Sequence, residues 1–203
     1  LPMNSGAEAV ETAIKSSRRW AYRTKKVTPG KAEIIVAEGN FHGRTTTIIS
    51  FSTDENSRHD FGPHTPGFVT VKYGCAKSLE AAINEHTAAV LIEPIQGEAG
   101  IVVPPANYLP EVREICTKNN VLMILDEIQS GLGRTGKLFA YEHSDIQPDG
   151  LILGKALGGG FMPVSCFLSS EEVLHWMNPG SHGSTFGGNP LAAALAKRSL
   201  ELL

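Results

Sequence analysis

Charged side chains follow three short apolar segments, and their types and positions could support chemistry. Asp126 follows VLMIL and Lys155 follows LILG, segments whose length and apolar character predict buried strands. A charge there is costly unless it is paired, so Asp126 indicates a salt bridge, a helix cap or a binding site. A desolvated lysine is a candidate Schiff-base nucleophile, although a surface lysine is the simpler interpretation. Glu93 and Glu98 follow AAVLI, either as ordinary turn residues or as groups that gate a charged substrate.

Two segments near the chain ends combine small residues with hydroxyl groups, a composition that suits an anion. Ser5 and Glu8 have the spacing of a capping box, and Gly6 and Ala7 leave the first amides of a predicted helix unobstructed. The segment 180–190 (GSHGSTFGGNP) places hydroxyls among glycines before a second predicted helix. A well-capped helix and a plain loop, both without a ligand, are the alternative interpretations.

An open α/β sheet would bring these residues together. Apolar, β-branched segments predict buried parallel strands, and segments with helical periodicity separate them. In such sheets ligands bind at the carboxyl ends of the strands. The expected strands are Glu33–Ala37, Phe68–Tyr73, Ala88–Glu93, Val121–Asp126, Leu151–Gly154 and Val164–Ser169, and the expected helical segments are Ser5–Lys25, Ala76–His86, Tyr108–Lys118 and Pro190–Leu203.

The composition excludes several classes of protein. The 203 residues include 18 basic and 21 acidic side chains, a net charge of −3, and 41% hydrophobic residues, which excludes disorder and a basic nucleic-acid surface. No apolar run reaches the roughly 18 residues that a membrane helix needs. Cys75, Cys116 and Cys166 are too scattered for a disulfide framework, and the histidines form no compact metal motif. The cytoplasm is the expected location, with the mitochondrial matrix as the alternative.

Two glycine-rich patterns favour nucleotide-binding enzymes only weakly. Gly131–Gly136 matches GxGxxG, but residues 126–130 separate it from the strand and no acid ends a strand about 20 residues later. The segment 150–156 resembles a P-loop that is one residue short and lacks the Ser or Thr for magnesium. A nucleotide-dependent oxidoreductase or an NTPase is therefore a minor alternative.

The combination of these motifs is more specific than its parts. An acid for a pyridine nitrogen, a lysine for an aldehyde and amide-rich turns for a phosphate together suit pyridoxal 5′-phosphate (PLP). The chain closely resembles the large domain of class III (subgroup II) PLP-dependent aminotransferases of fold type I, which implies a mostly parallel sheet flanked by helices in a three-layer α/β/α arrangement. The matching segments are MNSGAEA (3–9), NFHGRT (40–45), EPIQGEAG (93–100), LDEIQSGLGRTG (125–136), LGKALGGG (153–160) and GSHGSTFGGNP (180–190).

The resemblance implies roles for the residues around the cofactor. Lys155 would hold the cofactor through its aldehyde and then move a proton between the substrate and the cofactor. Asp126 would pair with the pyridinium nitrogen, which keeps the ring able to accept electrons. Gln129 would hydrogen-bond the phenolic oxygen, and Ile128 and Phe41 would pack on the two ring faces. Further contacts to the ring surroundings and the phosphate would come from His42, Glu93, Ser5, Gly6 and Ala7.

The resemblance also implies a homodimer with a shared active site, which binds amino acids and 2-oxo acids. Ser184 and Thr185 would reach the phosphate in the neighbouring subunit. Arg44 would bind a substrate carboxylate with its bidentate fork. Glu98 would act as a switch that pairs with an arginine when the amino donor binds and releases it for the carboxylate of the 2-oxo acid.

Within the class, LPMNSGAEAVETAIK and QGEAG are most similar to the branch that transfers the δ-amino group of ornithine to 2-oxoglutarate. Ala99 stands where the acetylornithine branch usually has glycine. N-acetylornithine or 4-aminobutyrate as the donor, and a non-catalytic fragment used for binding or assembly, are the alternatives. Residues 1–203 are expected to form the PLP-binding large domain, without the N-terminal segment and the C-terminal small domain of family subunits.

Overall fold

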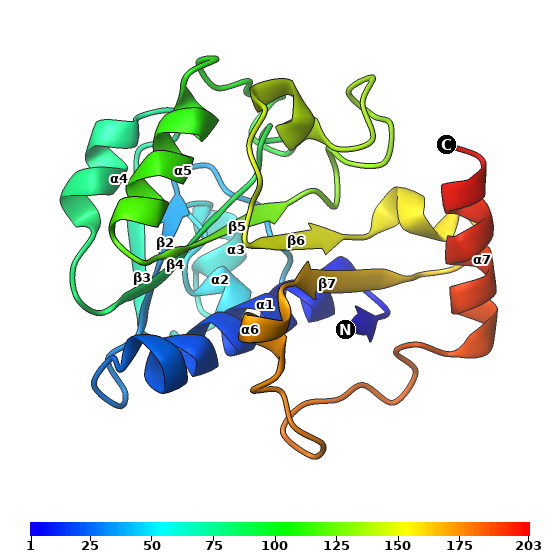
Figure 1. The fold of residues 1–203 in the computed structure, drawn as a ribbon, viewed down its shortest axis with the longest axis horizontal. Coiled ribbons are helices and arrows are strands. Elements are labelled where there is room, and N and C mark those ends of the chain that lie inside the picture. Colours follow the sequence, from blue (N-terminus) through cyan, green and yellow to red (C-terminus); the bar gives the residue numbers. More distant parts are fainter.

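A seven-stranded mixed sheet forms the centre of the computed structural model, which describes all 203 residues (Figure 1). The strand order is β1-β7-β6-β5-β4-β2-β3. Strands β3, β2, β4, β5 and β6 run parallel to one another, whereas β7 is antiparallel to both β6 and β1. The strands are β1 (Pro2–Met3), β2 (Glu33–Ala37), β3 (Phe68–Val71), β4 (Thr87–Ile92), β5 (Leu122–Asp126), β6 (Gly150–Leu153) and β7 (Ser165–Ser169).

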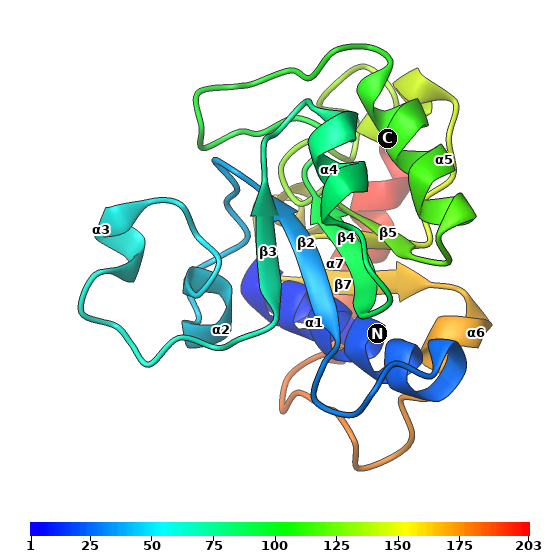
Figure 2. The ribbon, with the colours of Figure 1, turned by 90° about the vertical axis from the view of Figure 1, so that its left-hand side faces the viewer.

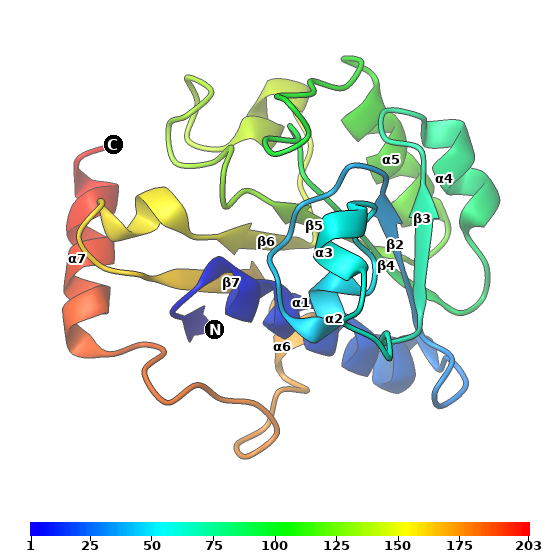
Figure 3. The ribbon, with the colours of Figure 1, turned by 180° about the vertical axis from the view of Figure 1, so that it is seen from behind.

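Helices cover both faces of the sheet. Helix α1 packs on one face, and α4 and α5 pack on the other, so that Figure 2 shows α4 and α5 on the side opposite α2 and α3. Helix α7 stands at one end of the molecule beside the 3₁₀ helix η3 (Figure 3). The bounds are α1 (Gly6–Trp20) with the π-helical η1 (Ala21–Lys25), α2 (Thr46–Ile49), α3 (Glu55–Arg58), α4 (Ala76–Ala82), α5 (Tyr108–Lys118), η2 (Ala140–Ser144), η3 (Lys155–Gly158), α6 (Glu171–Leu174) and α7 (Pro190–Glu201).

Two apolar cores lie on opposite faces of the sheet and explain the unbroken apolar runs. Ile34 and Val36 of β2 belong to the core under α1, whereas Ile35 belongs to the core under α4 and α5. Ile124 and Leu125 divide in the same way on β5. Because both faces are buried, neither set of alternating side chains can be polar. No helix is both long and apolar enough to cross a membrane.

The main predicted elements are confirmed, but the direction of one strand is wrong. The predicted segment Val164–Ser169 forms β7, which runs antiparallel rather than parallel to β6. The connection between them contains only the short η3, and a parallel crossover needs a dozen or more residues, usually with a full helix. The two-residue strand β1 and the four-residue helices α2, α3 and α6 were also not predicted from the sequence.

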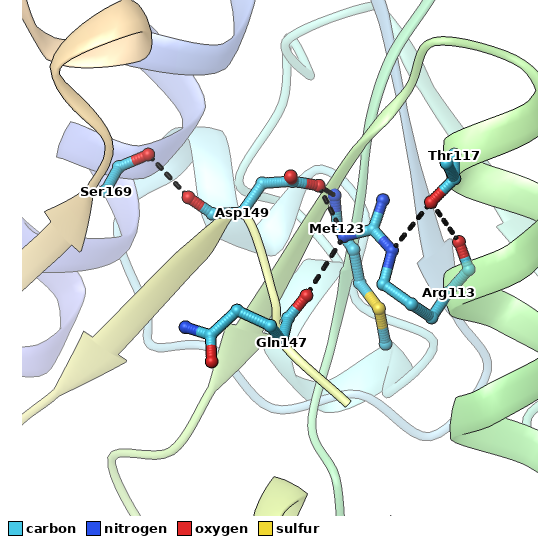
Figure 4. Close-up of polar contacts among 6 residues, drawn as sticks. All are labelled: Arg113, Thr117, Met123, Gln147, Asp149 and Ser169. Carbon is cyan, nitrogen blue, oxygen red and sulfur yellow. Dashed lines mark hydrogen bonds and ion pairs between the residues drawn. The ribbon is translucent and has the colours of Figure 1, made fainter. Parts of the chain in front are cut away.

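Asp149 ties the beginnings of β5 and β6 and the end of β7 to α5 (Figure 4). Its Oδ2 accepts hydrogen bonds from the backbone amide of Met123 and from Arg113 Nη1, both at 2.7 Å. Its carbonyl oxygen accepts a hydrogen bond from the Ser169 hydroxyl at 2.6 Å. These contacts hold β5, β6 and β7 together at the end of β5 that lies opposite Asp126. They therefore fix the strands that carry Asp126 and Lys155 at their amino ends.

We predict that Asp149→Ala lowers the free energy of unfolding by about 2 kcal/mol, because the buried Met123 amide and the Arg113 guanidinium both lose a charged acceptor. Denaturant unfolding followed by circular dichroism measures this. Glu114→Ala is the matched control, because Glu114 is exposed on the same helix as Arg113, and we expect a change within about 0.5 kcal/mol. Equal stability of the two variants would contradict the anchoring role of Asp149.

Candidate active site

The loops after β2, β4, β5 and β6 meet the beginning of α1 at the carboxyl ends of the parallel strands. This is where ligands bind in sheets of this kind. A cavity of about 180 Å³ lies at this place. Ten residues line it. One is Gly43 of the NFHGRT motif, and the other nine were singled out for the site from the sequence: Gly6, Ala7, Phe41, His42, Glu93, Asp126, Ile128, Gln129 and Lys155.

Asp126 is fixed at the end of β5 by two hydrogen bonds. Its Oδ1 accepts from the backbone amide of Ile128 at 3.0 Å, and its Oδ2 lies 2.7 Å from His42 Nδ1. Both side chains are buried. Burial acts to lower the pKa of His42, but the hydrogen bond with Asp126 and the charges of Asp126 and Glu93 raise this pKa above its ordinary value. The other ring nitrogen, Nε2, has no hydrogen-bond partner, and such a buried atom marks a place that a ligand can complete.

Glu93 brings a second buried acid to the cavity, directly after β4. Its Oε2 accepts a hydrogen bond from the backbone amide of Phe41 at 3.1 Å. Burial raises the pKa of Glu93 to about 7, with opposite contributions from the nearby charges of His42 and Asp126. Glu93 therefore holds the backbone of the loop that carries Phe41 and His42, and its charge changes near neutral pH.

Lys155 follows β6 in an unusual backbone conformation, with a φ of 42°. Residues other than glycine rarely adopt this left-handed region, and such strain often accompanies functional sites. Lys155 Nζ donates a hydrogen bond to Gln129 Oε1. The side chain of Lys155 is exposed, so the chain by itself does not supply the desolvation expected from the sequence.

Glycines bring the walls of the cavity close together. A Cβ atom on Gly6 would lie 2.8 Å from Ile128 Cδ1, and one on Gly97 would lie 1.8 Å from Gln129 Nε2. Gly43 has a φ of +126°, and a Cβ atom there would lie 2.8 Å from the Ala7 Cβ. Ile128 and Gln129 therefore keep their positions only because their neighbours lack side chains.

The capping box expected at the beginning of α1 is confirmed. Ser5 Oγ accepts a hydrogen bond from the Glu8 amide at 3.3 Å, and Glu8 Oε2 accepts one from the Ser5 amide at 2.7 Å. Ser5 uses its hydroxyl as a cap and does not line the cavity. The amides of Gly6 and Ala7 lie in the first turn, where intrahelical partners are absent, so this end of the helix suits an anion.

Arg44 and Glu98 lie in an adjoining cavity of about 280 Å³, and Phe41 lines both cavities. Arg44 Nη1 donates to Ser57 Oγ at 3.1 Å, and its guanidinium carbon lies 5.6 Å from the centre of the Phe41 ring. Both Arg44 and Glu98 are exposed. A cation and an anion thus line the same cavity, next to the Phe41 ring.

Ser184 and Thr185 lie away from the Lys155 cavity. They line a separate cavity of about 550 Å³ together with Asn4, Glu8 and neighbouring loop residues. The structure therefore does not bring them together with Lys155 within one chain.

Glu127 has a structural role that the sequence did not distinguish from that of its neighbour Asp126. Its carboxylate accepts hydrogen bonds from Ser130 Oγ at 2.8 Å and from the backbone amides of Ala140 and Tyr141 at 3.0 and 2.9 Å. Burial raises the pKa of Glu127 above its ordinary value. Glu127 thus closes the loop that contains Gly131–Gly136, and only the short η2 follows that loop, so no dinucleotide-binding helix is present.

The residues around the first cavity fit the PLP expected from the resemblance. They offer an amine, a buried acid supported by an imidazole with one unpartnered nitrogen, two apolar walls and free helix-terminal amides. An aldehyde, a protonated pyridine nitrogen, a flat ring and a phosphate each have a matching group in this set.

Comparisons with known proteins place the chain among aminotransferases. The family model "Aminotransferase class-III" matches residues 1–203. An ornithine aminotransferase from Exiguobacterium sp. is 60% identical over 203 residues, which are 100% of this chain and 50% of that protein. The crystal structure of the ornithine aminotransferase from Toxoplasma gondii has a TM-score of 0.99 at 47% identity, over 100% of this chain and 48% of that chain. An acetylornithine aminotransferase from Elizabethkingia anophelis has a TM-score of 0.86 at 53% identity, over 100% and 49% of the two chains. The chain therefore spans about half the length of these relatives.

We predict that Glu93→Gln removes part of the pH dependence of stability. The pKa of Glu93 is raised from 4.5 to about 7 in the folded state, so its contribution to stability is present below about pH 4.5 and is lost as the pH rises through 7. This loss is about 3 kcal/mol in the free energy of unfolding, and the variant should not show it, because glutamine stays neutral.

Denaturant unfolding at several pH values between 4.5 and 8 measures the difference between wild type and variant. Glu98→Gln, in the same loop but exposed, is the control and should follow the wild type. A Glu93→Gln profile parallel to the wild type would show that Glu93 does not titrate in this range.

Proposed function

We propose a function from the premise that this chain belongs to the class-III aminotransferase family. The protein that contains it transfers the δ-amino group of ornithine to 2-oxoglutarate, which gives glutamate 5-semialdehyde and glutamate, with PLP as the cofactor. The observation that carries the proposal is the single cavity in which Lys155, Asp126 and Gln129 meet at the carboxyl ends of the strands. The high identity to a protein named ornithine aminotransferase supports the choice of substrate.

Bound PLP supplies an electron sink for the charge left on a substrate carbon when its proton is removed. Asp126 keeps a proton on the ring nitrogen, because the Ile128 amide and His42 hold its carboxylate in place. Lys155 Nζ would hold PLP at its aldehyde carbon, with release of water, and would move a proton to and from the substrate carbon. Phe41 and Ile128 enclose the ring and exclude water from its faces.

The beginning of α1 binds the phosphate in this proposal. The Gly6 and Ala7 amides would hold the phosphate, and the helix dipole would add to the attraction. On the substrate side, Arg44 binds a carboxylate, because its planar fork can donate two parallel hydrogen bonds. Glu98 stands in the same cavity as Arg44 and binds or releases a cationic partner according to the charge of the substrate.

N-acetylornithine is the second candidate substrate, because one of the similar solved structures is an acetylornithine aminotransferase with 53% identity. That identity exceeds the 47% of the Toxoplasma gondii ornithine aminotransferase, whose backbone nevertheless agrees better, with a TM-score of 0.99 against 0.86. We favour ornithine, since the 60% identical relative also carries that name. 4-Aminobutyrate is the third donor to be compared.

We further propose a homodimer in which the loop with Ser184 and Thr185 reaches the phosphate of the second subunit. The separation of this loop from the Lys155 cavity of its own chain supports this arrangement. Residues 1–203 act as the PLP-binding large domain, and bacterial relatives support a cytoplasmic location.

The choice of substrate is tested by comparing kcat/KM for ornithine, N-acetylornithine and 4-aminobutyrate in the full-length protein. We expect kcat/KM for ornithine to exceed the others by at least about 100-fold, since a site that pairs a charged group discriminates strongly against its neutral analogue. Glutamate formed from 2-oxoglutarate, the product common to all three donors, is the measurement. A preference for N-acetylornithine, with little product from ornithine, would assign the protein to the acetylornithine branch.

We predict that Lys155→Ala lowers kcat by at least about 10³-fold, because the variant lacks the amine that moves the proton. Lys77→Ala is the matched control, since Lys77 is an exposed lysine on α4, and it should retain wild-type kcat. Borohydride reduction followed by peptide mass spectrometry should fix the cofactor on Lys155 in the wild type and in the control. Attachment to another lysine would refute the role of Lys155.

A further inference from the structure

We propose that Ser184 is a positioning residue rather than a phosphate ligand. Asn4 and Glu8 hold its hydroxyl so that the adjacent Thr185 alone donates to the phosphate in a second copy of this chain. The inference rests on the proposed homodimeric PLP enzyme, and it separates the roles of two residues that the resemblance treats alike.

The hydroxyl of Ser184 has no capacity left for a phosphate. It donates its only hydrogen to Glu8 Oε1 at 3.2 Å. It accepts hydrogen bonds from Asn4 Nδ2 at 2.9 Å and from the Gly187 amide at 3.2 Å. A serine hydroxyl has one hydrogen and two lone pairs, so all three are used. A phosphate oxygen needs a donor, and Ser184 could offer one only by leaving Glu8.

Thr185 has the opposite properties. It is exposed, and its hydroxyl makes no hydrogen bond within the chain. It lines the cavity of about 550 Å³ that also contains Glu8 and is separate from the Lys155 cavity. Its hydroxyl is therefore free to donate, and an acceptor that meets it lies outside the Lys155 cavity of its own chain.

Glu8 connects the two places. Its Oε2 accepts from the amides of Asn4 and Ser5 at 3.2 and 2.7 Å, which fixes the first turn of α1, and its Oε1 accepts from Asn4 Nδ2 at 3.1 Å and from Ser184. Burial acts to raise the pKa of Glu8, but these hydrogen bonds lower it below its ordinary value, so Glu8 is ionised at neutral pH. The carboxylate that caps the phosphate-binding helix of one site therefore also holds the loop directed to the other site.

His182 provides a second anchor for the same loop. Thr12 Oγ1 donates its hydrogen to the Glu8 carbonyl at 2.7 Å, so it must accept at the 2.8 Å contact with His182 Nε2. His182 Nδ1 then accepts from Lys15 Nζ at 2.9 Å. Glu8, Thr12 and Lys15 lie at i, i+4 and i+7, on one face of α1, so the loop is bound along two turns of the helix.

Mixed dimers test the proposal, with Lys155→Ala in one subunit so that only one site is active. The readout is the PLP concentration that gives half-maximal activity. A second readout is hydrogen exchange of residues 178–189 in the cofactor-free dimer. Ser184→Ala, Glu8→Ala and Thr185→Ala are each placed in the subunit without Lys155, where they affect only the loop offered to the active site. Ser181→Ala, in the same loop but without a contact to Glu8, is the matched control.

We expect Ser184→Ala and Glu8→Ala to raise the half-saturating PLP concentration about tenfold and to speed exchange in the loop, since each removes the same hydrogen bond. Thr185→Ala should raise it similarly without faster exchange. Ser184→Thr, which keeps a hydroxyl, should restore both readouts.

Three results would overturn the inference. A Glu8→Ala variant with unchanged PLP dependence, beside a Ser184→Ala variant with weakened PLP binding, would make Ser184 itself the ligand. Unchanged loop exchange in Ser184→Ala would exclude a positioning role. Effects that appear only when the substitutions are in the subunit with Lys155 would refute the proposal that the loop reaches the site of the other subunit. A wild-type protein without PLP-dependent activity would instead refute the proposed function.

Discussion

The buried hydrogen bond between Asp126 and His42 is the interaction on which the rest of the site depends. It joins the end of β5 to the loop after β2, and Glu93 supports the same loop from β4 through the Phe41 amide. Two acids and one imidazole are buried together, and the charges of Asp126 and Glu93 raise the pKa of His42. A ligand with a protonated nitrogen would therefore meet the carboxylate of Asp126, which His42 and the Ile128 amide already hold in position.

The sequence predicted the parts of the site that follow from sheet geometry. Parallel strands end at one edge, so Asp126 after one strand and Lys155 after another had to lie close together. The direction of β7 was mispredicted, because it depends on the short connection through η3 rather than on the apolar pattern of the strand. In the sequence, Asp126 and Glu127 are two adjacent acids after the same apolar segment and cannot be told apart by role. Their roles differ because consecutive side chains point to opposite sides, one to the cavity and the other to the amides of Ala140 and Tyr141.

The roles of individual hydroxyls lay outside the reach of the sequence. Ser184 and Thr185 are adjacent and chemically similar, yet only Ser184 meets Glu8 and Asn4, which lie at the other end of the chain. Composition and spacing show which hydrogen bonds a hydroxyl can make. Its partners in the fold decide whether its donor and lone pairs are still free for a ligand. The glycine at position 97 is comparable, because its importance follows from the closeness of Gln129 and not from any turn that it forms.

The face of α1 that holds the loop makes this helix sensitive to changes of length. Each residue of an α-helix turns the chain by about 100°, so one inserted residue between Glu8 and Thr12 would rotate Thr12 and Lys15 away from His182 while every original side chain was still present. The N-terminal cap would remain, and the second anchor would be lost. Evolution can therefore exchange residues along this helix far more easily than it can add or remove one.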